Sequence, residues 1–86
     1  MKTTKPVVAK AIISGKTYEG EGKTVLEALE NIRVPGLPRA KLILTVNQGG
    51  IHRTRIFQPT IAQRLFSPSP FVRQVALKNT ATLFAL

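Results

Sequence analysis

The pattern of apolar and polar positions is clearest over residues 23–32, where the sequence reads KTVLEALENI. Thr24 is a favourable N-cap residue, and Glu27 three positions later completes a T-x-x-E capping box. Apolar residues then recur at helical spacing. Pro35 ends the run, because the residue before a proline is pushed out of the helical region. The pattern therefore predicts a capped amphipathic helix over residues 24–32.

The segment before this helix predicts a β-hairpin. Residues 6–13 and 16–21 both alternate in the manner of strands, and Ser14 and Gly15 between them have the composition of a tight turn. A two-residue turn at this point sets Lys10 opposite Glu19. Opposite charges at such positions form a favourable cross-strand pair, so this register is the one we expect.

A second hairpin is predicted after the helix, from strands over residues 40–46 and 51–57. Its register depends on the length of the turn. A loop of two or four residues would put Arg53 and Arg55 on the face that carries the apolar residues of the first strand. Burial of two unpaired guanidinium groups costs several kcal/mol, whereas a three-residue loop over 48–50 places both outside. We therefore expect the three-residue loop, with a glycine bulge.

The C-terminal third predicts two short helices. Residues 59–66 begin with a proline, which is favourable at the first helical position. Ser69 is a candidate N-cap for a last helix over 70–78, and Asn79 is a candidate C-terminal cap. Residues 80–86 are compatible with either a closing strand or a tail docked on the core.

These elements together predict an α+β fold. A small antiparallel sheet of two β-hairpins, with the capped helix between them in the sequence, is covered by helix on one face, and two short helices follow at the C-terminal end. The chain has 86 residues, which is enough for one small domain. Residues 1–5 read as a flexible basic arm, and residues 6–86 as the single domain.

The net charge of the chain indicates the kind of partner that it binds. Thirteen Lys and Arg residues stand against four Glu and no Asp, which gives a net charge of +9. Such a balance favours polyanionic partners. The absence of cysteine excludes a disulfide framework, and no apolar run is long enough to cross a bilayer. The N-terminus has no signal-peptide core, so we expect a cytoplasmic or virion-associated protein without a membrane partner.

Basic residues dominate the second half of the chain, where no acidic residue follows Glu30. In the register that we expect, Arg53 and Arg55 share an exposed face with Lys41. Charged strand faces are commonly just solvated, and they also prevent pairing at sheet edges. The alternative is contact with phosphates. The candidate nucleic-acid-binding residues are Lys41, Arg53, Arg55, Arg39, Arg64 and Arg73.

Two other candidate sites, a phosphate-binding loop and a histidine site, have little support in the sequence. Two Gly-Lys-Thr triplets, at 15–17 and 22–24, lack the additional glycine of a phosphate-binding loop, and no Asp is present to hold magnesium. His52 is the only histidine, and nothing in the sequence brings a carboxylate to it. We read it as structural. The sequence thus predicts a protein that is not an enzyme and uses no cofactor or metal.

Two local resemblances follow from these patterns. The run over residues 22–32 after a hairpin resembles the strand-to-helix step of HicB-type antitoxins, although the rest of their pattern is missing. The same run, with Leu42-Ile43-Leu44-Thr45-Val46 and Gln63-Arg64-Leu65-Phe66, resembles small uncharacterised bacteriophage-encoded proteins. The second resemblance implies no site, but it favours a role in a virion or in assembly.

Two functions are therefore predicted. The first is a non-catalytic basic module that binds nucleic acid through its phosphates. The second is a structural or assembly protein, such as a phage virion component, that acts through protein–protein packing and is compatible with a homo-oligomer. Ionic strength separates them, because phosphate binding weakens with salt and apolar packing does not.

Overall fold

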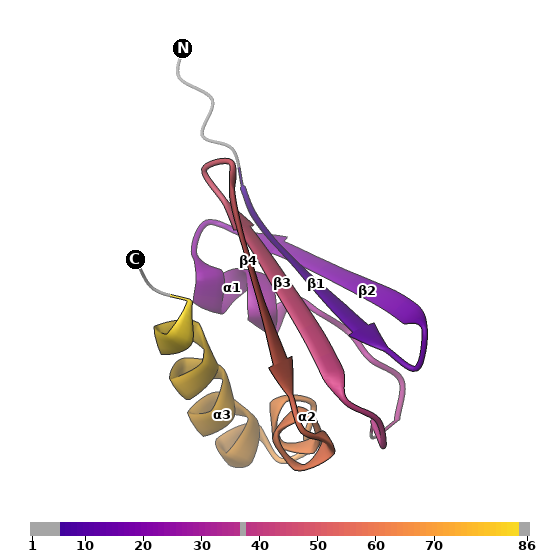
Figure 1. The fold of residues 1–86 in the computed structure, drawn as a ribbon. Helices are drawn as coiled ribbons and strands as arrows, with labels where there is room; N and C mark the ends of the chain where they lie inside the picture. Colours follow the sequence, from indigo (N-terminus) through magenta and orange to yellow (C-terminus); the bar gives the residue numbers. More distant parts are fainter. Residues whose placement is uncertain (1–5, 37, 85–86) are drawn as a thin grey trace.

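A computed structural model describes residues 6–36 and 38–84 as an antiparallel sheet with helices packed against it (Figure 1). The predicted α+β class is confirmed. The predicted basic arm, residues 1–5, lies outside the described residues. In chain order the elements are β1 (Val7–Ile13), β2 (Lys16–Gly22), α1 (Val25–Glu30), β3 (Leu42–Gln48), β4 (Ile51–Phe57), α2 (Pro59–Leu65) and α3 (Pro70–Leu83).

The first hairpin has the register that the sequence predicts. Ser14 and Gly15 form the turn with φ values of 52° and 78°, and these two positive values are typical of a type I′ turn. Lys10 faces Glu19 across the two strands. Their charged groups lie 3.7 Å apart and both are exposed, so the pair contributes little beyond fixing the register.

Helix α1 is capped as predicted. The Thr24 hydroxyl accepts a hydrogen bond from the Glu27 amide at 3.1 Å. The helix is shorter than the sequence pattern suggested, because it ends at Glu30 with Asn31 as its C-cap. The Asn31 side chain donates to the Glu21 carbonyl of β2 at 2.7 Å, which ties the end of the helix to the sheet.

A glycine lets α1 approach β2 closely. Gly20 is buried on the strand beneath the helix. A Cβ atom at this position would collide with the Ala28 carbonyl oxygen and would lie 2.6 Å from the Ile32 amide nitrogen. Both are backbone atoms that cannot move without shifting the helix. Sequence reasoning did not identify this requirement.

The sheet has the strand order β2-β1-β3-β4, so the two hairpins join through antiparallel pairing of β1 with β3. One face carries the core: Val7, Ala9, Ala11 and Ile13 of β1 and Leu42, Leu44 and Val46 of β3. Helix α1 packs on β1 and β2, and α3 packs on α1 and α2. The prediction that helix covers one face of the sheet is confirmed.

The C-terminal region differs from the prediction in one respect. Helix α3 does not end at Asn79 but continues to Leu83, so a closing strand is wrong for the described residues 80–83. Thr80 and Phe84 are both almost fully buried, and Leu77 joins them in the core. The last turn of α3 and the residue after it therefore dock on the core. Residues 85 and 86 lie outside the described part of the chain.

Candidate interaction surface

Strand β4 forms one edge of the sheet, and its register contradicts the predicted loop. Gln48 pairs with Ile51, so the turn consists of Gly49 and Gly50 alone. Their φ values of 60° and 84° again fit a type I′ turn, a backbone that glycine adopts without strain. The expected three-residue loop with a bulge is wrong.

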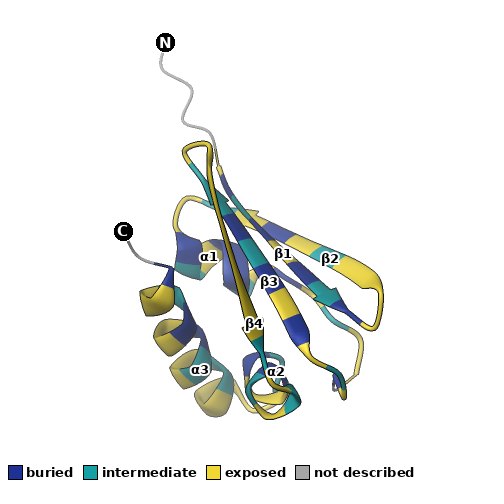
Figure 2. Cartoon of the chain, in the orientation of Figure 1, coloured by how far each residue is buried: buried dark blue, intermediate teal, exposed yellow. Residues whose placement is uncertain are grey.

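The shorter turn moves two arginines to the other face of the sheet. Arg53 pairs with Val46 and Arg55 with Leu44, so both project on the side that carries the core and the helices. They nevertheless remain exposed, because β4 is exposed at every position except Phe57, which is half-buried (Figure 2). The cost of burying these guanidinium groups therefore does not arise.

The six predicted binding residues do not form one surface. Lys41 lies directly before β3. Side chains alternate between the two faces of a strand, and this alternation assigns Lys41 to the face opposite Arg53 and Arg55. Arg39 is exposed in the loop that leads to the same strand. Arg64 is exposed on α2. The structure therefore brings Arg53 and Arg55 together and separates Lys41 from them.

Arg73 is a structural residue rather than a free cation. Its guanidinium donates to the Glu30 carbonyl at 2.7 Å and to the Leu65 carbonyl at 3.2 Å, with the Ile32 carbonyl at 3.5 Å. Glu30 ends α1 and Leu65 ends α2. A cation at the C-terminal ends of two helices satisfies their unpaired carbonyl groups and complements both helix dipoles. Arg73 thus joins α1, α2 and α3.

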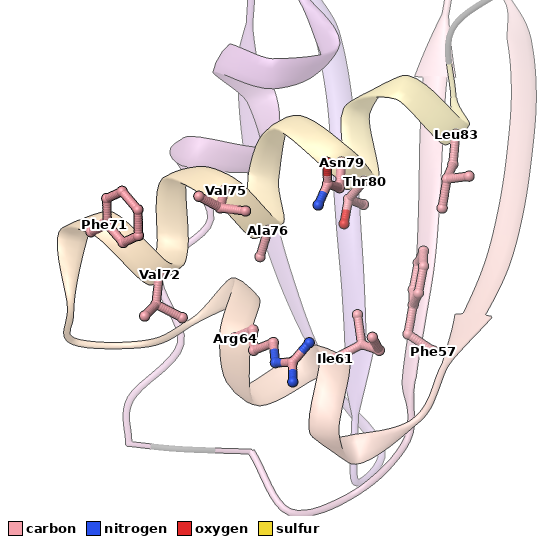
Figure 3. A pocket seen from close by; sticks show the side chains of 10 residues that line it. All are labelled: Phe57, Ile61, Arg64, Phe71, Val72, Val75, Ala76, Asn79, Thr80 and Leu83. Carbon is pink, nitrogen blue, oxygen red and sulfur yellow. The ribbon is translucent and has the colours of Figure 1, made fainter.

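An apolar groove lies between α3, α2 and the end of β4, and we call it the β4–α3 groove. It has a volume of about 360 Å³. Seven of its ten lining side chains are apolar, and Figure 3 shows Arg64 reaching from α2 into the space below α3. The lining residues are Phe57, Ile61, Arg64, Phe71, Val72, Val75, Ala76, Asn79, Thr80 and Leu83.

The rim of this groove exposes large apolar side chains. Phe71 is 78% exposed, Val75 46% and Leu83 44%. Helix α3 already buries Leu77 in the core, so these residues form a second apolar stripe beside the packed one. Ile51 is also 49% exposed, at the far end of β4 on the same face. Large apolar side chains that are exposed together beside a groove are a feature of contact sites.

The opposite face of the sheet carries a polar hollow that the sequence did not reveal. It is lined by Val8, Lys10, Glu19, Thr45, Asn47 and His52. The register places these residues on four neighbouring strands, so a carboxylate and the histidine do share one hollow. Asn47 Oδ1 has no hydrogen-bond partner there among the described residues. No group of three potential metal ligands occurs in the described ranges 6–36 and 38–84.

Charge is divided between the two edges of the sheet. The four Glu residues lie on β2 and α1, whereas Arg53 and Arg55 lie on β4 at the opposite edge. Among the residues that the structure describes, Lys10–Glu19 is the only ion pair. The arginines of β4 have no carboxylate partner within the described chain.

No protein-family model matches the chain, and no curated protein or solved structure matches it either. The description of the protein therefore rests on its fold and on this surface. It is a small α+β domain with an uncovered edge strand and an apolar groove beside it. Within the described residues, no helix has the length and apolar character needed to cross a membrane.

Proposed function

We propose that the protein is a non-catalytic structural or assembly protein that packs a partner protein on the face formed by β4 and the β4–α3 groove. The exposed apolar stripe on α3 is the observation that carries this proposal, because Phe71, Val75 and Leu83 would otherwise remain in water. A role in a bacteriophage particle is compatible with it and stays a prediction.

The partner is a different protein rather than a second copy. Each copy carries a net charge of +9, and like net charges oppose self-association. Three basic residues lie on the face of the proposed contact: Arg64 lines the groove, and Arg53 and Arg55 are exposed on β4. A partner with apolar and acidic groups complements both features.

Site-specific photo-crosslinking in a lysate of the native cells tests this proposal. A photoreactive residue replaces Asn79 in the groove, and a matched control replaces Thr17, which is exposed on the far edge strand. We expect one discrete protein adduct from position 79 only, still formed after nuclease treatment and at about 500 mM salt, where exposed charges are strongly screened. The adduct should weaken in a Phe71→Ser background.

Three results would contradict the proposal. Equal adducts from both positions would mean that the groove is not the contact. Loss of the adduct on nuclease treatment would indicate that nucleic acid bridges the two proteins. An adduct of twice the 9.4 kDa chain mass would show that the partner is a second copy.

Binding of nucleic acid through phosphates is a second candidate function. The observation that favours it is the pair of exposed arginines, Arg53 and Arg55, with no carboxylate partner in the described chain. Replacing both with Gln should flatten the log–log salt dependence of duplex binding by about 2 units, since each phosphate contact contributes about 0.9. The double variant Arg39→Gln/Lys41→Gln removes the same charge elsewhere and is the matched control.

A further inference from the structure

We infer that the free edge of β4 binds an extended acidic segment of the partner protein and adds it to the four-stranded sheet as another strand. This inference rests on the proposed function, because it names the chemistry of the partner at the same face. It is carried by the unpaired backbone of β4, by the charges beside that backbone and by the apolar groove at its end.

The backbone of β4 offers a row of free hydrogen-bonding groups. In a hairpin with a two-residue turn, the residues that flank the turn form a hydrogen-bonded pair, and alternate pairs follow the same pattern. With Gln48 opposite Ile51, the pairs that include Arg53, Arg55 and Phe57 are hydrogen-bonded to β3. The amides and carbonyls of His52, Thr54 and Ile56 therefore point away from the sheet.

Neither a bulge nor a proline interrupts this strand. The register between β3 and β4 is continuous over seven residue pairs, so no bulge twists the edge away. The strand contains no proline, and six of its seven residues are exposed. Its only protection against another strand is the positive charge of Arg53 and Arg55.

That charge opposes pairing with a second copy of the chain. An antiparallel β4–β4 pair that uses all seven residues must be centred on Thr54. It would place Arg53 of each copy opposite Arg55 of the other, and like charges directly opposite each other on a sheet are destabilising. A strand with Asp or Glu at two alternate positions instead meets both arginines with opposite charge.

The groove explains how such a strand is anchored. Phe57 follows Arg53 and Arg55 on the same face of β4 and is itself part of the groove lining. A partner side chain opposite Phe57 projects on this face, next to Leu83 and Ile61 (Figure 3). The predicted segment therefore carries two acidic residues at alternate positions and an apolar residue on the same face at the end that meets Phe57. Main-chain hydrogen bonds provide the affinity and the side chains provide the selectivity.

Selection from a random peptide library displayed on phage tests this inference. The peptides are about seven to nine residues long, which is the usual length of a strand. The wild-type protein should enrich peptides with Asp or Glu at alternate positions and an apolar residue at one end. The Arg53→Glu/Arg55→Glu variant should enrich Lys or Arg at those positions instead. Both replaced residues are exposed, so the fold should tolerate the change.

A backbone variant separates strand addition from simple charge attraction. Thr54→Pro removes an amide that points away from the sheet, a position at which an edge strand tolerates proline. It leaves both arginines in place. The selected peptides should bind this variant roughly tenfold more weakly or worse, since a lost hydrogen bond of about 1.4 kcal/mol is a factor of ten. Thr54→Val keeps the amide and should bind like the wild type.

The outcomes also distinguish this inference from the proposed function. If no acidic pattern is enriched, or if Thr54→Pro binds as well as Thr54→Val, the inference is wrong. If the selected peptides are apolar, lose binding with Phe71→Ser and ignore both β4 variants, the groove binds protein but the edge does not. If duplex DNA competes and the peptides do not depend on Thr54, the arginines serve as a phosphate site.

Discussion

Replacement of Arg73 by alanine is expected to destabilise the protein more than the loss of any other cation in the described chain. The guanidinium donates to carbonyl groups at the ends of α1 and α2 at 2.7 and 3.2 Å, and it belongs to α3. Alanine removes both bonds, so the Leu65 carbonyl loses this partner and the Glu30 carbonyl keeps only the longer bond from Arg33 at 3.3 Å. The variant thus tests whether one side chain connects the three helices.

The magnitude follows from the geometry. Hydrogen bonds from a charged donor contribute about 1.5–3 kcal/mol each. The two bonds share one partly buried side chain, and water can reach part of the site, so the expected cost is roughly 2–4 kcal/mol. For a domain of 86 residues, the free energy of unfolding is on the order of 4–13 kcal/mol. The midpoint temperature should therefore fall by roughly 8–30 °C.

Denaturant and thermal unfolding, followed by circular dichroism, measure this loss. Arg53→Ala is the matched control, because that side chain is exposed on β4 and should change stability by no more than about 0.5 kcal/mol. Arg73→Lys keeps the charge but loses the planar fork, so it should fall between the two. Equal midpoints for Arg73→Ala and Arg53→Ala would refute the structural role. Wild-type stability in Arg73→Lys would mean that charge, rather than the bidentate geometry, is what matters.

Two further predictions concern α1. Gly20→Ala should lower the free energy of unfolding by about 2 kcal/mol or more, because the new Cβ collides with backbone atoms of the helix region. Thr17→Ala on the same strand is the control. Equal denaturation midpoints for the two variants would show that the helix can move away from the strand. Thr24→Ala should lower the free energy of unfolding by about 1 kcal/mol through loss of the N-cap hydrogen bond, and Thr24→Ser should keep the wild-type stability. A Ser variant that is as unstable as the Ala variant would argue against the cap.

The elements that the sequence predicted correctly are those with local signals. The Thr24 cap depends on residues three positions apart, and the first hairpin depends on a two-residue turn flanked by Lys10 and Glu19. In each case the residues that decide the structure are neighbours in the chain or across one turn. The alternation or helical spacing of apolar residues is then sufficient to predict the element.

The features that the sequence could not show depend on contacts between distant elements. Arg73 lies 43 residues from Glu30, and nothing in its local sequence distinguishes it from an exposed helix arginine. The apolar residues of α3 predict a packed face, yet the helix packs with Leu77 and leaves Phe71 in solvent. Which of two apolar stripes enters the core is decided by the position of α1 and α2, and the local pattern of α3 does not show it.

The second hairpin shows how a correct energy argument can give a wrong register. Burial of two unpaired guanidinium groups is indeed costly, but the argument assumed that the helix-bearing face is covered along its whole width. Helix α3 packs on α1 and α2 instead, and β4 stays exposed. The turn chemistry of Gly49 and Gly50 then decides the register, since two adjacent glycines favour a type I′ turn. The consequence is functional: Arg53 and Arg55 lie on the same face as the β4–α3 groove, so one extended partner segment can engage both.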